Sequence, residues 1–378
     1  MKKIRVLQSV GSLGVGGNEI FVMNFFRNID KEKFQVDFVI YDDRKMDFYD
    51  EVIAAGSKVY ICKSNMDNKY LNFLYTIKKV IKILRNNKYD IIHCHSCSFI
   101  GIFKGAIAGN LVKGTKVISH SHNPGMPKNT FTDEIIRNVS KKYLSRIVDF
   151  GFACSDIAGE SKYTDKFIKS SKYAIINNAI EVNKFIFNEN IRNEMRKKYD
   201  ISNNEVVIGN IGRLEIQKNQ EFLLKIFAEI QNKNSLAKLI IIGEGSLEES
   251  LKKCAIKNRI EENVIFAGKV SNPEKYYHMM DTFVLTSFYE GFPFVMVESQ
   301  VNGLPAVVSN AITKSVNILG NVEFVSLDDS VEIWADKILK NCREIESVVC
   351  NNYIYEEYDL KYQAKKLEKY YVELLNLK

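Results

Sequence analysis

The sequence contains no run of the ~18 to 20 apolar residues that a membrane-spanning helix needs. A secretory leader has no room, because the first predicted strand, Ile4–Val10, begins almost at the start of the chain. The seven cysteines are odd in number and lack regular spacing, which indicates reduced thiols rather than a disulfide framework. Together these absences predict a cytoplasmic protein.

A dense basic stripe with interleaved aromatic residues is also absent, so the sequence does not favour a nucleic-acid partner. The net charge of +7 is nevertheless uneven. Residues 1–180 contain 28 Lys and Arg against 17 Asp and Glu, a balance of +11, whereas the remainder carries −4. This basic half is either a solvated lysine-rich surface or a face for an anionic partner, such as a diphosphate-linked acceptor or the inner face of the plasma membrane.

What is present is an alternation of short apolar runs with longer segments of helical period. A chain of 378 residues exceeds what one hydrophobic core usually organises, so two domains are expected. Strand followed by helix, repeated, predicts parallel sheets covered on both faces. The predicted strands of the first half are Ile4–Val10, Phe34–Ile40, Lys58–Ile61, Tyr89–Cys94, Lys116–Ser119, Phe150–Cys154 and Tyr173–Ile176. Those of the second half are Val206–Ile211, Lys238–Ile242, Val264–Ala267, Thr282–Thr286 and Ala306–Ser309.

The expected organisation is therefore an α/β fold with two Rossmann-like domains, 1–178 and 179–352, followed by a helical tail, 353–378. The tail has a helical period from residue 353 to residue 377, with Tyr and Leu on one side and many charges on the other. It either packs on its own domain or crosses back to the first.

A glycine-rich turn follows the first strand and contains Gly11, Gly14, Gly16 and Gly17. Glycine permits positive φ and close backbone approach, and the N–H groups at a helix start favour a phosphate or another anion. A dinucleotide fingerprint is not favoured, because a GxGxxG pattern from Gly14 places Glu19 where the third glycine belongs.

Two cations follow the first strand of the second domain. Arg213 comes directly after that strand, and Lys218 lies at the start of the next helix. The carboxyl edge of a parallel sheet is where α/β folds bind ligands, so both cations are placed to meet an anion. Taken alone, two surface cations are the simpler interpretation.

The segment from Glu290 to Glu298 carries the most specific pattern. Gly291 permits a sharp turn after a strand, and Pro293 suits the first turn of the helix that follows. The N–H groups of this helix start face the same sheet edge as the cations. Glu298 lies in apolar surroundings, where the two hydroxyls of a ribose would satisfy its carboxylate. The alternative is a helix cap followed by a surface glutamate.

A cluster of histidines and cysteines raises the question of a metal site. It contains His93, Cys94, His95 and Cys97. Adjacent strand residues point to opposite faces of a sheet, so these four cannot all converge on one ion. A thioredoxin-like role is not favoured either, because the Cys pair does not introduce a helix in a unit of thioredoxin size. No metal is expected here.

Several of these motifs, in this order, closely resemble those of the retaining glycosyltransferases of family four, which have the GT-B fold. The matching residues are Gly212, Arg213, Lys218 and Asn219, then Glu290, Gly291, Phe292 and Pro293, and finally Glu298. The resemblance covers almost the whole chain, because Gly16–Glu19 and Asp90–His95 also look like that family.

The resemblance implies roles for the matched residues. Arg213 and Lys218 would neutralise the donor diphosphate and the leaving group, Glu290 would bind the transferred sugar, and Glu298 would hold the ribose. Backbone contacts to the sugar, the phosphates or the base would come from Gly16, Gly17, Gly268, Val270, Gly291, Phe292, Pro293 and Phe294. The family's histidine near the transferred sugar corresponds to His122, with His120 as the alternative on the same face of the strand.

The resemblance further implies a retaining transfer from a nucleotide-diphosphate sugar, with a UDP-sugar as the first choice, in a cleft between the two domains. The acceptor would be a saccharide or lipid-linked saccharide of capsular, exopolysaccharide or lipopolysaccharide biosynthesis. No metal cofactor is expected, because cations and a helix start face the departing diphosphate and an Asp-x-Asp motif is absent. Two rivals remain, a sugar-nucleotide epimerase of similar fold and a non-catalytic nucleotide-sugar-binding partner of a transferase.

Overall fold

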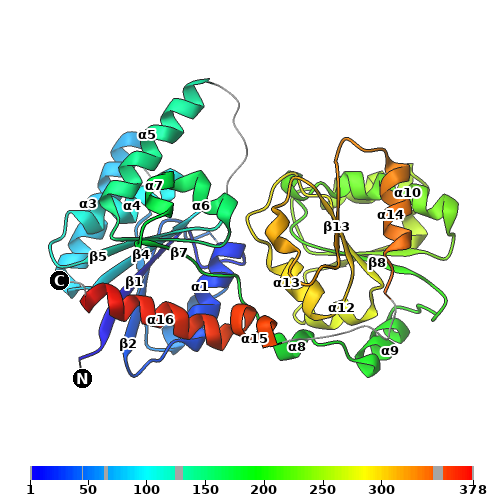
Figure 1. The fold of residues 1–378 in the computed structure, drawn as a ribbon, viewed down its shortest axis with the longest axis horizontal. Helices are drawn as coiled ribbons and strands as arrows, with labels where there is room; N and C mark the ends of the chain where they lie inside the picture. Colours follow the sequence, from blue (N-terminus) through cyan, green and yellow to red (C-terminus); the bar gives the residue numbers. More distant parts are fainter. Residues whose placement is uncertain (1, 45, 64–66, 124–130, 344–351, 377–378) are drawn as a thin grey trace. The chain divides into compact units, whose positions relative to one another are not determined.

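The computed structural model describes residues 2–44, 46–63, 67–123, 131–343 and 352–376. The chain forms two compact units. Unit 1 contains Met1–Ala179 and Asp359–Lys378, and unit 2 contains Ile180–Tyr358. Each unit has one parallel sheet with helices packed on both of its faces (Figure 1). The α/β fold class expected from the sequence is thereby confirmed.

Unit 1 contains a seven-stranded sheet in the order β3-β2-β1-β4-β5-β6-β7. Its strands are β1 (Ile4–Val10), β2 (Phe34–Ile40), β3 (Val59–Ile61), β4 (Ile91–Ser96), β5 (Lys116–Ser121), β6 (Phe150–Ala153) and β7 (Tyr173–Ile175). Its helices are α1 (Gly17–Asn28), α2 (Tyr49–Ala54), α3 (Lys69–Asn87), α4 (Phe99–Asn110), α5 (Phe131–Ile147), α6 (Asp156–Lys162), α7 (Asp165–Ile168) and α16 (Leu360–Asn376). Helices α3 and α4 lie on one face of the sheet, and α1 and α16 lie on the other (Figure 1).

Unit 2 contains a six-stranded sheet in the order β10-β9-β8-β11-β12-β13. Its strands are β8 (Val207–Ile211), β9 (Lys238–Ile242), β10 (Val264–Gly268), β11 (Thr282–Leu285), β12 (Ala306–Ser309) and β13 (Val322–Val325). Its helices are α8 (Val182–Phe185), α9 (Glu189–Lys198), α10 (Gln220–Lys233), α11 (Glu248–Lys257), α12 (Glu274–Met279), α13 (Phe294–Val301), α14 (Val331–Lys340) and α15 (Asn352–Tyr358).

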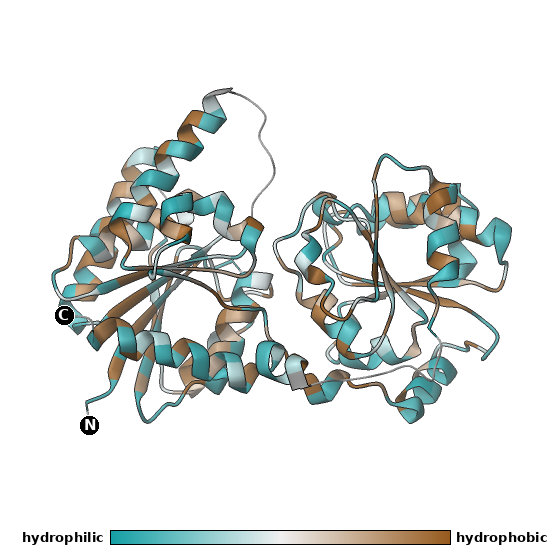
Figure 2. Cartoon of the chain, viewed as in Figure 1, coloured by the Kyte–Doolittle hydropathy of each residue, from teal (hydrophilic) through white to brown (hydrophobic). Residues whose placement is uncertain are grey.

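Both sheets owe their stability to strands that are buried on both faces. The strand residues are mostly Val, Ile, Leu and Phe, and Figure 2 shows the strands in brown while the outer helix faces are largely teal. In unit 2 the core continues into α10 and α14, where Phe227 and Trp334 have no exposed surface. Among the described helices, none is both long and apolar enough to cross a membrane.

The strand order creates one switch point in each sheet. In unit 1 the chain leaves β1 toward β2 on one side, and later adds β4 on the other side of β1. In unit 2 the same reversal falls between β8 and β11. Loops that follow the two strands of a switch point diverge and leave a crevice at the carboxyl edge, which is where open α/β sheets bind ligands.

The helical tail is divided at Asp359 rather than continuous, and residue 377 lies outside the described residues. Helix α15 belongs to unit 2, whereas α16 packs on α1 of unit 1. On α16 the ring of Tyr371 has no exposed surface and meets the rings of Phe25 and Phe34 edge-on or tilted. The last helix of the chain therefore completes the core of the first unit.

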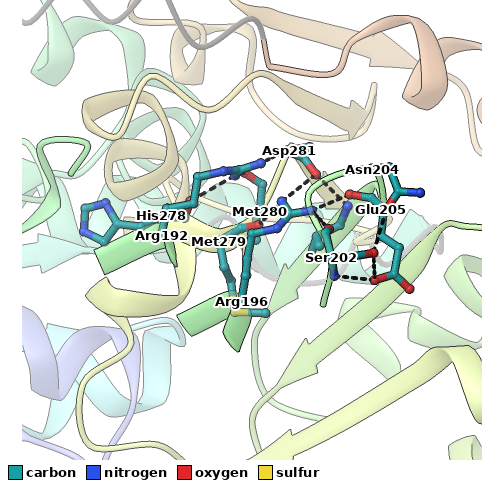
Figure 3. A network of polar contacts seen from close by, with 10 residues as sticks. Arg192, Arg196, Ser202, Asn204, Glu205, His278, Met279, Met280 and Asp281 are labelled. Carbon is teal, nitrogen blue, oxygen red and sulfur yellow. Dashed lines mark hydrogen bonds and ion pairs between the residues drawn. The ribbon is translucent and has the colours of Figure 1, made fainter. Parts of the chain in front are cut away.

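The charged helix α9 is held on unit 2 by a buried ion-pair network (Figure 3). The Asp281 carboxylate accepts from Arg192 Nη2 at 2.5 Å and from Arg196 Nη1 at 3.3 Å. It also accepts from the backbone N–H of Val207 at 2.7 Å, next to the start of β8. Both guanidinium groups donate to carbonyls of residues 278–280 as well. This network explains how a helix of low hydrophobicity packs against the core.

Several elements were not expected from the sequence. They are α2, α6, α7, α8, β13 and α14. Most are short, but α14 had a readable signal, because Val331, Trp334, Ala335 and Ile338 recur at helical spacing and the last three are buried.

Candidate functional site

The centre of the candidate site in unit 2 is an ion pair at the β8/β11 switch point. Lys218 ends the 3-10 turn Ile216–Lys218 after β8, and Glu290 follows β11. Their charged atoms, Lys218 Nζ and Glu290 Oε1, are 2.6 Å apart, and the side chains are only 13% and 7% exposed. Gln217 Nε2 donates to the other carboxylate oxygen at 3.3 Å. The structure thus brings together two residues that are 72 positions apart in the sequence.

Hydrogen bonds between the two loops fix this pair. The backbone N–H of Phe288 donates to the Gln217 carbonyl at 2.9 Å. The hydroxyl of Thr286 donates to the carbonyls of Lys218 and Asn219, at 3.2 and 2.9 Å. Because the loop after β8 and the loop after β11 are tied in this way, the positions of the ammonium and the carboxylate are set before any ligand arrives.

Glycines make room for the lysine stem and for the neighbouring loops. A Cβ on Gly212 would lie 3.1 Å from Lys218 Cε, and a Cβ on Gly243 would lie 2.0 Å from the Gly212 carbonyl oxygen. Gly243 also has a φ of +137°, which other residues rarely adopt. Two strand ends therefore approach each other at a distance that only glycine allows.

Arg213 lies on the same sheet edge but is exposed. Within the described part of the chain, no carboxylate forms an ion pair with its guanidinium. An arginine in this state is available to a ligand anion, whereas Lys218 is already paired with Glu290.

Helix α13 begins at Phe294, with Pro293 as its N-cap residue. Phe292 and Gly291 are buried. The expected turn does not depend on a positive φ at Gly291, because its backbone lies outside the left-handed region. Pro293 precedes the helix instead of occupying its first turn, which corrects the sequence prediction by one residue.

Glu298, in the second turn of α13, has a partner that the sequence did not reveal. Tyr277 on α12 donates its hydroxyl to Glu298 Oε2 at 2.5 Å. Burial raises the pKa of Glu298 to about 7, although the bond from Tyr277 acts in the opposite direction. In its ionised form Glu298 can accept hydrogen bonds from ligand hydroxyls.

The loop after β10 lies beside the loop after β9. Gly268 has a φ of +66° with open space where a Cβ would be, and its carbonyl accepts from the Gly243 N–H at 2.9 Å. Val270 is partly buried. This loop therefore extends the same edge of the sheet with backbone groups rather than charged side chains.

At the corresponding edge of unit 1, the glycine-rich turn leads from β1 into α1. None of Gly11, Gly14, Gly16 and Gly17 has a positive φ, so the turn uses their small size rather than the left-handed region. A Cβ on Gly16 would lie 2.5 Å from Glu19 Oε2, whereas Gly17 faces open space. The Glu19 carboxylate beside Gly16 does not suit the third-glycine position of a GxGxxG dinucleotide site, in line with the argument against that fingerprint.

Four of the five histidines meet on one face of the unit 1 sheet. They are His93 and His95 on β4, His120 on β5 and His122 directly after it. The rings of His120 and His122 stack at 4.3 Å, and His95 Nδ1 lies 2.9 Å from His122 Nε2. His120 is fully buried and neither of its ring nitrogens has a hydrogen-bond partner, whereas His122 is 8% exposed at the sheet edge. The sequence predicted that His120 and His122 share one face of the sheet, but it did not predict that His93 and His95 lie beside them.

Burial lowers the pKa of all four histidines, to about 3 for His122 and well below the usual value for the others. These imidazoles are consequently neutral at physiological pH. Each ring then has one N–H donor and one acceptor nitrogen.

Three of these histidines lie close enough together to raise the question of a metal centre. One nitrogen each of His93, His95 and His120 lies within 4.8 Å of the others. A tetrahedral zinc ion with Zn–N bonds of ~2.0 to 2.1 Å requires ligand nitrogens roughly 3.4 Å apart. His95 already uses one nitrogen toward His122 and the other toward Gln8 Oε1, at 2.8 Å. Cys94 faces α4 instead, close to Gly105. The four histidines thus form a cluster that is held together by hydrogen bonds and ring stacking.

Family models match both units. The model "Glycosyltransferase Family 4" matches residues 15–184, and the model "Glycosyl transferases group 1" matches residues 191–344. EpsF of Bacillus subtilis, a protein named as a glycosyltransferase, is 27% identical over 89% of this chain and 87% of its own length. An Escherichia coli UDP-Gal:α-D-GlcNAc-diphosphoundecaprenol α-1,3-galactosyltransferase is 25% identical over 93% of this chain and 92% of its own.

Solved structures show the same fold. HepE of Anabaena, solved with UDP, has a TM-score of 0.77 at 18% identity, covering 98% of this chain and 100% of HepE. Sucrose-phosphate synthase of Thermosynechococcus elongatus has a TM-score of 0.78 at 14% identity, with both chains covered completely. With the two family models matched in order, the chain is a glycosyltransferase of family four, group 1, with the GT-B fold.

Proposed function

We propose that this enzyme transfers a sugar from a UDP-sugar to a saccharide or lipid-linked saccharide with retention of the anomeric configuration. The observation that carries the proposal is the Lys218–Glu290 pair at the β8/β11 switch point, with exposed Arg213 on the same edge. Arg213, Lys218 and the N-terminus of α13 would stabilise the charge that develops on the departing diphosphate. No divalent metal is required for this role.

Glu290 and Glu298 would bind the neutral parts of the donor. Glu298 accepts hydrogen bonds from the ribose hydroxyls, and Glu290 meets the transferred sugar once the diphosphate competes for Lys218. The backbone of Gly291, Phe292, Pro293 and Phe294 contributes N–H donors, and Gly268 and Val270 lie by the base. Gly16, Gly17 and His122 of unit 1 are proposed as further donor-binding residues on the family resemblance alone.

For the chemical step we infer a front-side route, in which the acceptor hydroxyl attacks the anomeric carbon from the side of the leaving diphosphate. The bond from the anomeric carbon to the phosphate oxygen breaks, and the departing phosphate takes the acceptor proton. None of the carboxylates in the proposed site is assigned as a nucleophile. Retention then follows because attack and departure occur on the same face of the sugar.

The proposed donor and acceptor classes are supported by relatives. HepE was solved with UDP, and the E. coli relative is named for a UDP-Gal donor and a diphosphoundecaprenol-linked acceptor. A Campylobacter jejuni relative, 26% identical over 86% of this chain, is named for another diphospho-undecaprenol-linked acceptor. We infer a corresponding step in bacterial surface polysaccharide assembly on the cytoplasmic side of the membrane.

The experiment is an assay of the purified enzyme with UDP-sugars and undecaprenyl-diphosphate saccharides in the presence of EDTA, with the product analysed by NMR. An α-linked product from an α-linked donor supports the proposal. An inverted product contradicts retention. A new sugar nucleotide formed without acceptor would indicate an epimerase, and donor binding without any turnover would indicate a binding partner.

We also propose that unit 1 contacts an anionic membrane through α5. Large apolar side chains are exposed along this helix, namely Ile135, Ile136, Val139 and Tyr143. Cations flank them at Arg137, Lys141, Lys142 and Arg146. An apolar stripe edged by cations suits the boundary between headgroups and acyl chains.

Flotation with liposomes tests this contact. The protein is expected to float with vesicles that contain anionic lipid and to remain in solution with neutral vesicles. Val139→Glu should abolish flotation, whereas Ile256→Glu, at an exposed position on α11 of unit 2, should not. Flotation of Val139→Glu at the wild-type level would contradict the assignment to α5.

A further inference from the structure

A chain of hydrogen bonds joins the C-terminal helix to the candidate active-site histidine through the interior of unit 1. Gln8 on β1 lies at its centre. Gln8 Nε2 is 3.2 Å from the Tyr371 hydroxyl, and Gln8 Oε1 is 2.8 Å from His95 Nε2. From there, His95 Nδ1 is 2.9 Å from His122 Nε2. At the other end, the Tyr371 hydroxyl is 2.7 Å from His93 Nδ1. All five side chains are at most 8% exposed.

The orientation of the Gln8 amide fixes where each proton lies. Because Gln8 Nε2 donates to Tyr371, Gln8 Oε1 must accept from His95, so His95 carries its proton on Nε2. The neutral His95 ring then offers Nδ1 as an acceptor, and His122 donates to it from Nε2. His122 is left with an unprotonated Nδ1. The Tyr371 hydroxyl, which accepts from Gln8, keeps its own proton to donate to His93 Nδ1, 2.7 Å away.

We propose that Gln8 and Tyr371 are positioning residues, which hold His122 in the Nε2–H tautomer through His95, so that His122 Nδ1 accepts a hydrogen bond from a hydroxyl of the transferred sugar. The sugar contact rests on the proposed function, whereas the tautomer does not. The reversed tautomer would present an N–H donor at Nδ1, to which a sugar hydroxyl could bind only as the acceptor. The Gln8 amide thereby decides whether His122 Nδ1 is a hydrogen-bond acceptor or a donor.

The anchor of this chain is rigid because Tyr371 is held on several sides. Its ring lies between Phe25 and Phe34 with no exposed surface, and α16 is fastened to unit 1 by Glu368, whose Oε1 accepts from the Asp30 N–H at 2.8 Å. Without the Tyr371 hydroxyl, Gln8 Nε2 would lose its acceptor. The amide could then rotate by half a turn, and His95 and His122 could exchange tautomers together.

The test uses selective ¹⁵N labelling of the five histidines, because the ring nitrogen shifts report the tautomer directly. His278 in unit 2 is an internal reference, since its Nδ1 accepts from the Asn188 N–H at 3.1 Å and it must carry its proton on Nε2. Tyr371→Phe removes one hydroxyl and keeps the ring. The matched control is Tyr370→Phe on the same helix, where the ring meets Phe150 and Phe152.

In the wild type, His93, His95 and His122 should show the Nε2–H pattern of His278. Tyr371→Phe and Gln8→Leu should give mixed or reversed tautomers at His95 and His122, and kcat should fall by about threefold to tenfold, the worth of one hydrogen bond. Tyr370→Phe should change neither quantity. An Nδ1–H tautomer at His122 in the wild type, or an unchanged tautomer in both variants, would overturn the proposal. If the tautomers are as expected but no sugar is transferred from the donor, the proposed function is wrong. The tautomers set by the chain of hydrogen bonds are then still confirmed.

Discussion

At the scale of single residues, the proposed site in unit 2 is centred on the Lys218–Glu290 pair. Both groups are largely buried, so each depends on the other for neutralisation until a ligand arrives. Because of this burial, the ammonium and the carboxylate are held in fixed positions, unlike the mobile charged groups of surface side chains.

Lys218→Ala should lower kcat by about 100-fold or more, because it removes a preorganised cation from the departing diphosphate and leaves Glu290 unpaired. Steady-state kinetics with saturating donor measure this loss. Lys225→Ala is the matched control, since Lys225 forms an exposed pair with Glu221 at 2.9 Å. A kcat within threefold of the wild type for Lys218→Ala would contradict the assigned role.

Glu298 should make stability depend on pH. Its pKa is about 7 in the folded protein against an ordinary 4.5, so between these values the native state keeps a proton that the unfolded state has lost. The contribution of Glu298 to the free energy of unfolding therefore falls as pH rises from about 4.5 to about 7 and then levels off, opposite in sign to the contribution of the four buried histidines. Glu298→Gln should remove this slope, and thermal unfolding from pH 5 to pH 8 checks it. The exposed Glu249→Gln should retain it.

At the scale of secondary-structure elements, α9 depends on the buried network around Asp281. Asp281→Ala should lower the free energy of unfolding of unit 2 by about 3 to 5 kcal/mol, because two buried guanidinium groups lose their carboxylate. Urea unfolding measures the change. Asp336→Ala breaks an exposed pair with Lys233 and should cost less than about 1 kcal/mol. Equal costs for the two variants would contradict the account of how α9 is held.

The sequence predicts those elements best whose pattern is local. The strands Ile4–Val10 and Lys238–Ile242 have the bounds expected from their apolar runs. The partner of Glu298 could not be predicted, because Tyr277 lies on another helix and only packing brings the two together. The histidine cluster was missed for the same reason, since the register that sets His95 beside His120 belongs to the sheet.

At the scale of the whole molecule, the end of the chain belongs to unit 1. Tyr371, Leu367 and Leu374 on α16 are buried there, so unit 1 cannot complete its core from the first 179 residues alone. Unit 2, in contrast, is one continuous segment with its own core.

A fragment of residues 180–358 should consequently fold cooperatively and bind UDP, while residues 1–179 without α16 should aggregate or stay partly unfolded. Circular dichroism during heating and UDP titration calorimetry distinguish the two fragments. Cooperative folding of residues 1–179 alone would show that α16 is dispensable. Loss of UDP binding by the folded fragment 180–358 would show that unit 2 does not hold the nucleotide by itself.

In the proposed function, unit 2 binds a nucleotide-diphosphate sugar through Arg213, Lys218, Glu290 and Glu298 without a metal. The most direct measurement is thermal unfolding of the full chain with UDP, GDP, ADP and their sugars in EDTA. UDP and its sugars should stabilise the protein by about 2.7 kcal/mol at a hundredfold excess over Kd, and Lys218→Ala should remove the effect. Absence of stabilisation by all three nucleotides, or stabilisation that requires a divalent metal, would contradict it.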